Sequence, residues 1–496
     1  MRILLTFTLT VLLSSLLFSC FDDEKFSSNP SLRLEFSSDT VRFDTVFTTI
    51  GTPKQTLKIY NKNKDAVTIG SVKVMNPDVS GFTITVDGSV GDEVHNIDIW
   101  GKDSAFMWVA VKVNPLNQDK PVLIRDSIQV SWNGNIHYIQ LEALGQDVFI
   151  WRGKTIDKDT TLTDKKPFLI YDSLVINKGV TVNIEKNTYM YFHNAAKVKL
   201  DGTLRVVGTL EEPVVFRGDR TDWFFSNVPY DRLPGQWDGI VVDSLSFNNY
   251  FEHFHFRNSV NGIKFKHSNT SQKKAVFVNS IIHNTKEDGL SAENCKIEAY
   301  NSLFSNAAGS TVKLVGGDYY FLHCTLANWM TWISRKKGSY ALMIGNATEN
   351  KNAIPLERCE FINTVISGSV SHEAGLQRAE GNTTALNYKF DHCFIRGTSK
   401  DTIEGGEILV NNIWKRADVK FKTIDGKTLY YDFRLDSVSV AKDAADPSYS
   451  VISDPSLPVN MQYDMLGNSR LSDGFPDIGC YEWMPYNATF RRKDWY

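Results

Sequence analysis

Apolar and polar positions alternate in short runs between residues 32 and 147, a pattern typical of β-strands. In Thr56–Tyr60, Phe82–Val86 and Trp108–Val113 almost every second residue is apolar, as expected when one face of a strand packs into a core and the other faces water. Turn-forming clusters such as Asn61–Asp65 separate the runs. About six or seven short strands at this spacing predict an immunoglobulin-like β-sandwich over residues 32–147.

From residue 148 the runs become shorter and the turns tighter. Stretches such as Leu174–Ile184 and Lys197–Val207 contain β runs separated by Gly or Asn, each too short to form a sheet alone. Units of this kind stack into solenoids. An Asn or His followed by a small residue recurs, and the first two intervals are 22 residues long. The positions are Asn279, Asn301, His323, Asn363 and His392. The pattern predicts a β-helix over residues 148–407, with these side chains stacked at one turn.

Residues 408–496 are predicted to form the final coils and a C-terminal cap. Asp464, Gly467 and Arg470 form an Asp-x-x-Gly-x-x-Arg motif, and Pro476–Glu482 reads Pro-Asp-Ile-Gly-Cys-Tyr-Glu. With the preceding coils, this ending resembles bacterial surface proteins of the right-handed parallel β-helix (pectate-lyase-like) family, over about residues 150–483. The resemblance implies a terminal cap that covers strand edges and core.

The sandwich region resembles the immunoglobulin-type domains of Hydin and spindle proteins. The resemblance rests on Phe43–Val46, Val111–Pro115 and Ile139–Gly145, and it implies a spacer or a protein-binding module. We therefore predict an all-β chain, in which an N-terminal immunoglobulin-like β-sandwich precedes a right-handed parallel β-helix solenoid with a C-terminal cap.

The N-terminal residues predict that the protein is attached to a membrane. Arg2 precedes the apolar run Ile3–Phe18, and Cys20 follows Ser19 directly, which resembles the lipobox of bacterial lipoproteins. The resemblance implies a signal peptide over residues 1–19 and a lipid anchor at Cys20. Residues 20–31 are predicted to form an acidic tether, and Phe21–Lys25 within it resembles the short export signal of Bacteroidetes lipoproteins, which implies the outer face of the outer membrane. A cleaved signal with an incidental Cys, a plain solvated tether and the periplasmic face are the alternatives.

Asp-Ser/Thr triplets recur more often than average residue usage predicts. They resemble the O-glycosylation sites of exported Bacteroidetes proteins, and turn chemistry before a strand is the alternative explanation. The candidate acceptors are Thr40, Thr45, Ser104, Ser127, Ser173 and Ser244.

Composition narrows the function classes. The 496 residues carry 54 Lys+Arg and 57 Asp+Glu, a net charge of −3, which argues against nucleic-acid partners. No apolar stretch after the N-terminus reaches the length of a membrane span. Cys295, Cys324, Cys359, Cys393 and Cys480 have no metal-ligand spacing, so we predict neither a metal nor a cofactor, and buried free thiols or one disulfide.

Catalytic candidates are sparse. The β-helix family includes polysaccharide lyases and hydrolases, but the sequence has no Gly-His-Gly turn of the hydrolase type. Lys264, Glu287 and Asp288 could combine a base with carboxylates on neighbouring coils, and His372 with Glu373 could form an acid–base pair. A solvated turn between coils and a surface loop are the alternatives for these two sets of residues, and the simpler explanations.

An aromatic and basic loop is the candidate binding site. Two Trp, a Tyr and several cations fall between residues 328 and 340, and such rings and charges suit an anionic sugar or a protein hot spot. Packing of the Trp residues onto the helix flank is the alternative. The candidates are Trp329, Trp332, Arg335, Lys336 and Tyr340, and Trp223–Phe225 with Tyr230 forms a similar second loop.

We predict a lipid-anchored, cell-surface protein that binds a glycan, or a partner protein of an outer-membrane complex, without catalysis. The competing hypothesis is a polysaccharide lyase or glycoside hydrolase that acts on an acidic polysaccharide. A third hypothesis is a purely structural spacer at the cell surface.

Overall fold

The computed structural model describes residues 25–381, 383–398, 408–450 and 455–485. Cys20 lies outside these residues. The chain divides between Asp147 and Val148 into two compact units, which are described separately below.

The first unit is a β-sandwich of two five-stranded sheets around one apolar core. Inward positions such as Ile59, Ile84, Val109 and Ile128 are fully or almost fully buried, which confirms the alternation predicted from the sequence. Strand β2 pairs in parallel with β10, and the other pairs are antiparallel. One sheet has the order β1 (Glu35–Phe36), β3 (Gln55–Tyr60), β8 (Ser104–Val111), β5 (Phe82–Val86), β6 (Ser89–Gly91). The other has the order β2 (Thr40–Phe47), β10 (Asn135–Gln146), β9 (Val122–Trp132), β4 (Val67–Val74), β7 (Glu93–Ile99), and the short α2 (Pro77–Ser80) precedes β5.

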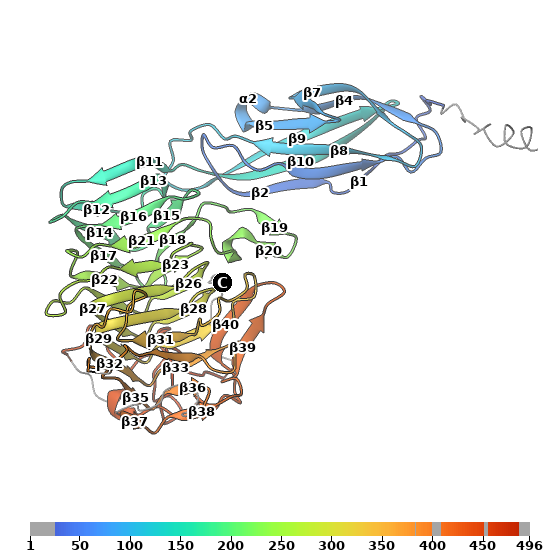
Figure 1. The fold of residues 1–496 in the computed structure, drawn as a ribbon. Coiled ribbons are helices and arrows are strands. Elements are labelled where there is room, and N and C mark those ends of the chain that lie inside the picture. Colours follow the sequence, from blue (N-terminus) through green and yellow to red (C-terminus); the bar gives the residue numbers. More distant parts are fainter. Residues whose placement is uncertain (1–24, 382, 399–407, 451–454, 486–496) are drawn as a thin grey trace, which may run out of the picture. The chain divides into compact units, whose positions relative to one another are not determined.

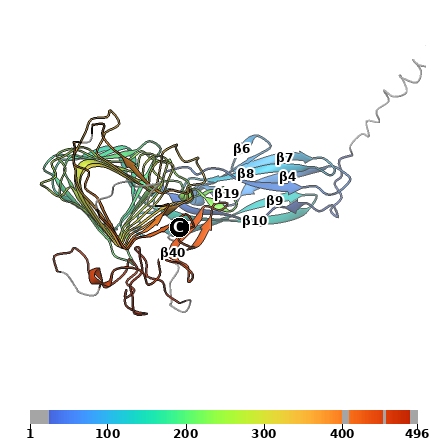
Figure 2. The same cartoon turned by 60° about the horizontal axis from the view of Figure 1, so that its bottom comes forward.

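The second unit is a parallel β-helix built on a 26-stranded sheet. Each strand pairs in parallel with one a coil further on, for example β16 with β21 and β21 with β24. Figure 1 shows the coils stacked along one axis, and Figure 2 shows their triangular outline. The strands are β11 (Phe149–Ile156), β12 (Thr160–Leu162), β13 (Phe168–Ile176), β14 (Thr181–Glu185), β15 (Tyr189–Phe192), β16 (Lys197–Leu200), β17 (Thr203–Val207), β18 (Val214–Gly218), β21 (Gly239–Val242), β22 (Asn249–Glu252), β23 (Phe254–Arg257), β24 (Ile263–Phe265), β25 (Ala275–Val278), β26 (Ile281–Thr285), β27 (Leu290–Tyr300), β28 (Leu303–Ala307), β29 (Val312–Leu322), β30 (Thr325–Asn328), β31 (Leu342–Gly345), β32 (Leu356–Ile362), β33 (Val365–Gly368), β34 (Ala374–Gln377), β35 (Lys389–Asp391), β36 (Phe394–Arg396), β37 (Ile408–Val410) and β38 (Ile413–Lys415).

Aromatic rings stack from coil to coil in the interior of this unit. The ring centroids of Phe192 and Trp237 lie 4.0 Å apart, and Phe361 stacks between Phe321 and Phe390 at 4.9 and 5.3 Å. Such stacks remove large apolar areas from water and fix the register of successive coils. The five cysteines of the described residues are buried free thiols.

The predicted ladder of Asn and His residues is confirmed. Its members lie at one turn of successive coils with backbone φ between 45° and 50°, a left-handed conformation in which Asn and His are enriched. Neighbours also interact through their side chains: Nδ2 of Asn279 lies 3.3 Å from Nε2 of His253, and Nδ2 of Asn363 lies 3.0 Å from Nε2 of His323. The ladder consists of His253, Asn279, Asn301, His323, Asn363, His392 and Asn411.

The ladder predicts a pH dependence of stability. Burial lowers the pKa of His253 from about 6.5 to about 4, so the folded protein keeps this imidazole neutral where the unfolded chain is protonated. The unfolded state then binds more protons, and stability falls as the pH drops from 6.5 towards 4. At pH 5 this term amounts to about 2 kcal/mol. The variant His253→Asn keeps a residue type suited to the turn, so between pH 7.5 and pH 5 it should lose about 2 kcal/mol less unfolding free energy than the wild type in urea titrations. Equal losses would contradict this role.

The C-terminal segment differs from the predicted end cap, because it runs along the side of the coils. The hairpin β39 (Phe421–Asp425) and β40 (Tyr430–Leu435) and the turn η2 (Pro447–Tyr449) lead into it. Asn363 exchanges two hydrogen bonds with the backbone of Asp446, and Asn301 donates to the carbonyl of Tyr463 at 2.9 Å. The segment therefore straps several coils together through the Asn/His ladder, and Figure 2 shows it outside the triangular outline.

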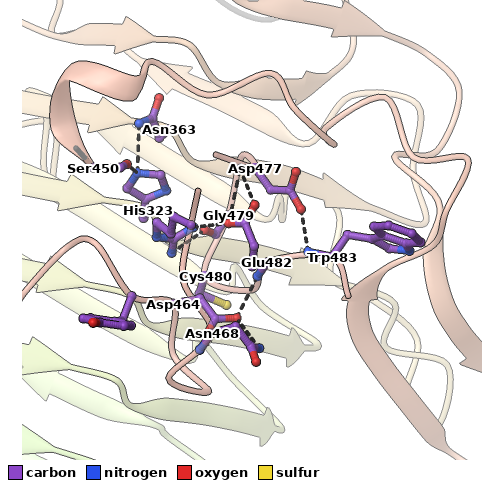
Figure 3. Close-up of polar contacts among 12 residues, drawn as sticks. His323, Asn363, Ser450, Asp464, Asn468, Asp477, Gly479, Cys480, Glu482 and Trp483 are labelled. Carbon is purple, nitrogen blue, oxygen red and sulfur yellow. Dashed lines mark hydrogen bonds and ion pairs between the residues drawn. The ribbon is translucent and has the colours of Figure 1, made fainter. Parts of the chain in front are cut away.

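Both sequence motifs of this segment form its buried polar centre (Figure 3). Arg470 and Glu482 are fully buried and form an ion pair at 3.2 Å. Arg470 also donates to Oδ1 of Asn301 at 2.9 Å and to the carbonyl of Gly479 at 3.1 Å. Asp464 accepts the backbone N–H of Glu482 at 2.8 Å. These contacts join the two motifs to each other and attach the C-terminal segment from Asp446 onward, called the strap below, to the Asn/His ladder.

Candidate functional site

An inserted hairpin leaves the solenoid between β18 and β21. It contains β19 (Trp223–Phe225), β20 (Val228–Pro229) and the turn η1 (Tyr230–Arg232). Asp231 at its base lies 2.7 Å from Nε of Arg257 and 3.2 Å from Arg217. Burial alone would raise the pKa of Asp231, but the two guanidinium groups outweigh it and lower the pKa. The base of the hairpin is therefore held by a charge network.

The tip of this hairpin and the 329–340 loop form an exposed aromatic cluster, defined as Trp223, Phe224, Phe225 and Trp332. The ring of Trp332 meets Phe224 at 5.4 Å and 87°, and Phe225 at 6.5 Å and 67°. Trp223 and Phe225 are 56% exposed, and Phe224 and Trp332 are 39% exposed. The two loops singled out in the sequence thus meet in space, although about 100 residues separate them.

Trp329 is not part of the cluster, and the expectation that it lies exposed is wrong. It is 8% exposed, because the hairpin of β39 and β40 covers it: the ring centroids of Phe421 and Phe433 lie 5.3 and 6.1 Å away. Packing onto the helix flank, the alternative considered from the sequence, accounts for this residue.

Next to the cluster in the chain, the same loop borders an open cationic hollow of about 550 Å³. One side is formed by Arg335–Tyr340 and the other by Val370–His372 and Ala374–Leu376. Gly375 packs closely under the ring of Tyr340, since a Cβ atom at this position would lie 2.4 Å from that ring. Four of the predicted residues line the hollow together, namely Arg335, Lys336, Tyr340 and His372, and Lys337 joins them.

The buried pair of Arg335 and Glu373 shapes the hollow. The side chain of Glu373 is fully buried, and that of Arg335 is 8% exposed. Arg335 donates to both carboxylate oxygens at 2.6 and 2.9 Å, and the backbone N–H groups of Ala341 and Val370 donate to the same carboxylate. With four donors on it and no exposure, Glu373 is a structural anion, so the expected acid–base pair with His372 is wrong.

The other catalytic candidates lie on neighbouring coils. Lys264 on β24 pairs with Ser291 on β27, and Ser291 pairs with Lys313 on β29. Glu287 forms an ion pair with Lys336. Asp288 accepts the backbone N–H of Ser310 at 2.7 Å, and burial raises the pKa of its carboxyl. The structure thus ties Glu287 and Asp288 into turn contacts.

The six candidate glycosylation sites are all partly exposed. At three of them the preceding Asp accepts the backbone N–H of the Ser or Thr, at 2.9 Å for Thr45, 2.7 Å for Ser104 and 2.8 Å for Ser127. Thr45 and Ser127 lie within strands β2 and β9, and Ser104 begins β8, so at these three sites the Asp side chain bonds the backbone of a strand.

One further polar group combines ligand types that metals accept. Asp391, His392 and Asp446 offer atoms within 4.8 Å of one another. Lys389, however, forms an ion pair with Asp391 at 2.7 Å, and His392 lies 2.7 Å from the same carboxylate. The group is explained as an ion-pair network.

Among the residues that the structure describes, none of the helices has the length and apolar character of a membrane span.

Comparisons with known proteins show no family. No protein-family model matches the sequence, and no curated protein matches it. Among solved structures, a protein of unknown function from Porphyromonas gingivalis W83 is 16% identical over 26% of this chain and 51% of its own, with a TM-score of 0.18. A family 123 glycoside hydrolase from Clostridium perfringens is 10% identical over 23% of this chain and 26% of its own, with a TM-score of 0.16. Pectate lyase Pel9A is 12% identical over 62% of this chain and 87% of its own, with a TM-score of 0.24.

The chain therefore spans about half the length of the Porphyromonas protein and about a quarter of that of the Clostridium hydrolase. Similarity at this level carries no argument about activity.

Proposed function

We propose that this protein binds an anionic glycan in the cationic hollow without chemically altering it. The observation that carries the proposal is the convergence of Arg335, Lys336, Lys337 and His372 around one open hollow beside the ring of Tyr340. Carboxylate or sulfate groups of a glycan would pair with the exposed Lys337 and displace Glu287 from Lys336, while Arg335 holds the wall of the hollow through Glu373. The ring face of Tyr340 offers a surface for the sugar.

The state of the nearby carboxylates supports binding over catalysis. A general acid or base must reach the reacting atoms, whereas Glu373 is fully buried under Arg335 and Glu287 pairs with Lys336. Proposed with this function is the setting predicted from the sequence: a lipid anchor at Cys20 in the outer membrane, exposure at the cell surface, and sugar on some of the Asp-Ser/Thr sites.

A polysaccharide lyase or hydrolase is the second candidate, and one observation favours it. Burial raises the pKa of Asp288, as a general acid requires, and Lys313 close to it carries a charge that could face an acidic sugar. A partner protein in place of the glycan is the third candidate.

The test is retention on polygalacturonate, an acidic glycan, compared with neutral dextran. Replacing Lys336 and Lys337 by alanine should weaken retention at least tenfold, because two charges are removed from the hollow. The matched control is Lys158→Ala with Lys178→Ala, two exposed lysines on an early coil, which should bind as the wild type does.

Unchanged retention in the hollow variant would contradict the proposed site. Release of sugar products that disappears in Asp288→Asn would establish the enzyme instead.

A further inference from the structure

Glycan binding in the cationic hollow gives no reason for the exposed aromatic cluster. Four rings at the tips of two separate insertions are 39–56% exposed. At about 150–250 Å² per aromatic side chain, this leaves roughly 400 Å² of apolar surface in water. An exposed apolar patch of this size is often functional.

The hairpin that carries three of the rings is held rigidly. Arg220 forms two hydrogen bonds of 2.6 Å with Asp222 and lies 3.7 Å from the centre of the Tyr230 ring. Arg257 forms two more with Asp231, at 2.7 and 2.8 Å. A tip fixed in this way loses little conformational freedom when it binds. The only charged residue between 222 and 229 is Asp222, and Arg220 neutralises it.

The geometry of the rings decides between kinds of partner. Phe224 and Phe225 meet at 71°, and Trp332 meets Phe224 at 87°, so the cluster is a compact knob and not the flat platform on which a sugar ring would stack. Its area of roughly 400 Å² is about half of what one partner contributes to a standard protein interface. A knob of Trp and Phe beside lysines matches the chemistry that inserts into the interfacial region of a lipid bilayer.

An exposed basic residue lies within reach of the same surface. Lys337 follows Trp332 by five residues, so their Cα atoms are at most about 18 Å apart, and Lys337 is exposed. An anionic lipid surface attracts such side chains over about a Debye length.

From these observations we infer that the aromatic cluster is a membrane-contact site, which inserts Trp223, Phe224, Phe225 and Trp332 into the interface of a bilayer with anionic headgroups. The inference is independent of the glycan function. It would hold this face of the β-helix against the membrane to which the predicted anchor at Cys20 delivers the chain.

The experiment is co-sedimentation with lipid vesicles, using protein produced from Lys25 onward, which keeps both compact units and lacks Cys20. The probes are vesicles of phosphatidylcholine alone and of phosphatidylcholine with phosphatidylglycerol. The wild type should bind the anionic vesicles, and Phe224→Ser with Phe225→Ser should lower the partition coefficient at least tenfold. Trp332→Ser, on the other insertion, should lower it as well. Phe106→Ser is the matched control, since Phe106 is 41% exposed on the sandwich, and it should not change binding.

Circular dichroism should show the same fold for all four proteins. Failure of the wild type to bind anionic vesicles would overturn the inference, and so would vesicle binding that survives in the cluster variants. Retention on polygalacturonate that falls in the cluster variants, with vesicle binding intact, would assign the rings to the glycan site.

Discussion

Replacing Arg470 by methionine is expected to lower the free energy of unfolding of the β-helix by about 3–5 kcal/mol. Arg470 is the fully buried cation of the strap, and it links Glu482, Asn301 and the carbonyl of Gly479. Methionine fills a similar volume but leaves the buried carboxyl and the two acceptors without their donor. Urea unfolding followed by circular dichroism measures the change.

The pH dependence of this loss of unfolding free energy distinguishes the electrostatic contribution of Arg470 from its packing contribution. Burial raises the pKa values of Asp464 and Asp477, and Arg470 counters this effect at Asp464. A carboxyl whose pKa is raised by folding stabilises the folded state less as the pH increases above its ordinary value. The deficit of Arg470→Met should therefore be larger at pH 8 than at pH 5. The control Arg42→Met removes an exposed ion pair with Glu142 and should unfold like the wild type. A deficit that is small and independent of pH would contradict the account of the strap.

The second large effect is expected for Arg335→Met, which should abolish glycan retention and destabilise the β-helix by about 3–5 kcal/mol. The substitution leaves the fully buried carboxylate of Glu373 with backbone donors alone. Because Arg335 also bonds the carbonyls of Asn328 and Ser339, the loop that borders the hollow loses its attachment. Retention and urea unfolding should be measured on the same preparation.

Two comparisons make this prediction specific. Lys351→Met removes the cation of an exposed ion pair with Glu380 and should change neither quantity measurably. The double change of Lys336 and Lys337 to alanine should weaken retention with little effect on unfolding, since both side chains are exposed. If Arg335→Met retained the glycan, the buried pair would not be what shapes the hollow.

The fold could be predicted from the sequence where the signal is local. A left-handed residue at the same turn of the successive coils from His253 to Asn411 favours Asn or His, so the ladder appears as a residue type that recurs along the sequence. The alternation of Phe82–Val86 likewise follows from one strand with one buried face. Each of these signals lies within a few residues of the structure that it predicts.

The remainder depends on contacts between distant residues. The strap joins Asn301 to Arg470, 169 residues away, so its motifs could be recognised but not placed, and an end cap was the simpler expectation. Trp329 looked like an exposed binding residue because the hairpin that buries it lies about 90 residues later.

The same limit applies to the site. Arg335 and Glu373 are 38 residues apart in the sequence, so the sequence places one in the binding loop and the other in a possible acid–base pair, although they form one ion pair. The anchors of the hairpin, Arg217, Asp231 and Arg257, lie on separate elements and gave no sequence motif.

The central claim is that the cationic hollow binds an acidic glycan and leaves it intact. Isothermal titration calorimetry of the protein with a short oligogalacturonate tests this claim most directly. After the titration, the sugar is recovered from the calorimeter and its mass is determined. The account predicts saturable binding at one site per chain, weakened by salt, with the oligosaccharide recovered unchanged. Absence of binding, or recovery of shortened or unsaturated products, would contradict it.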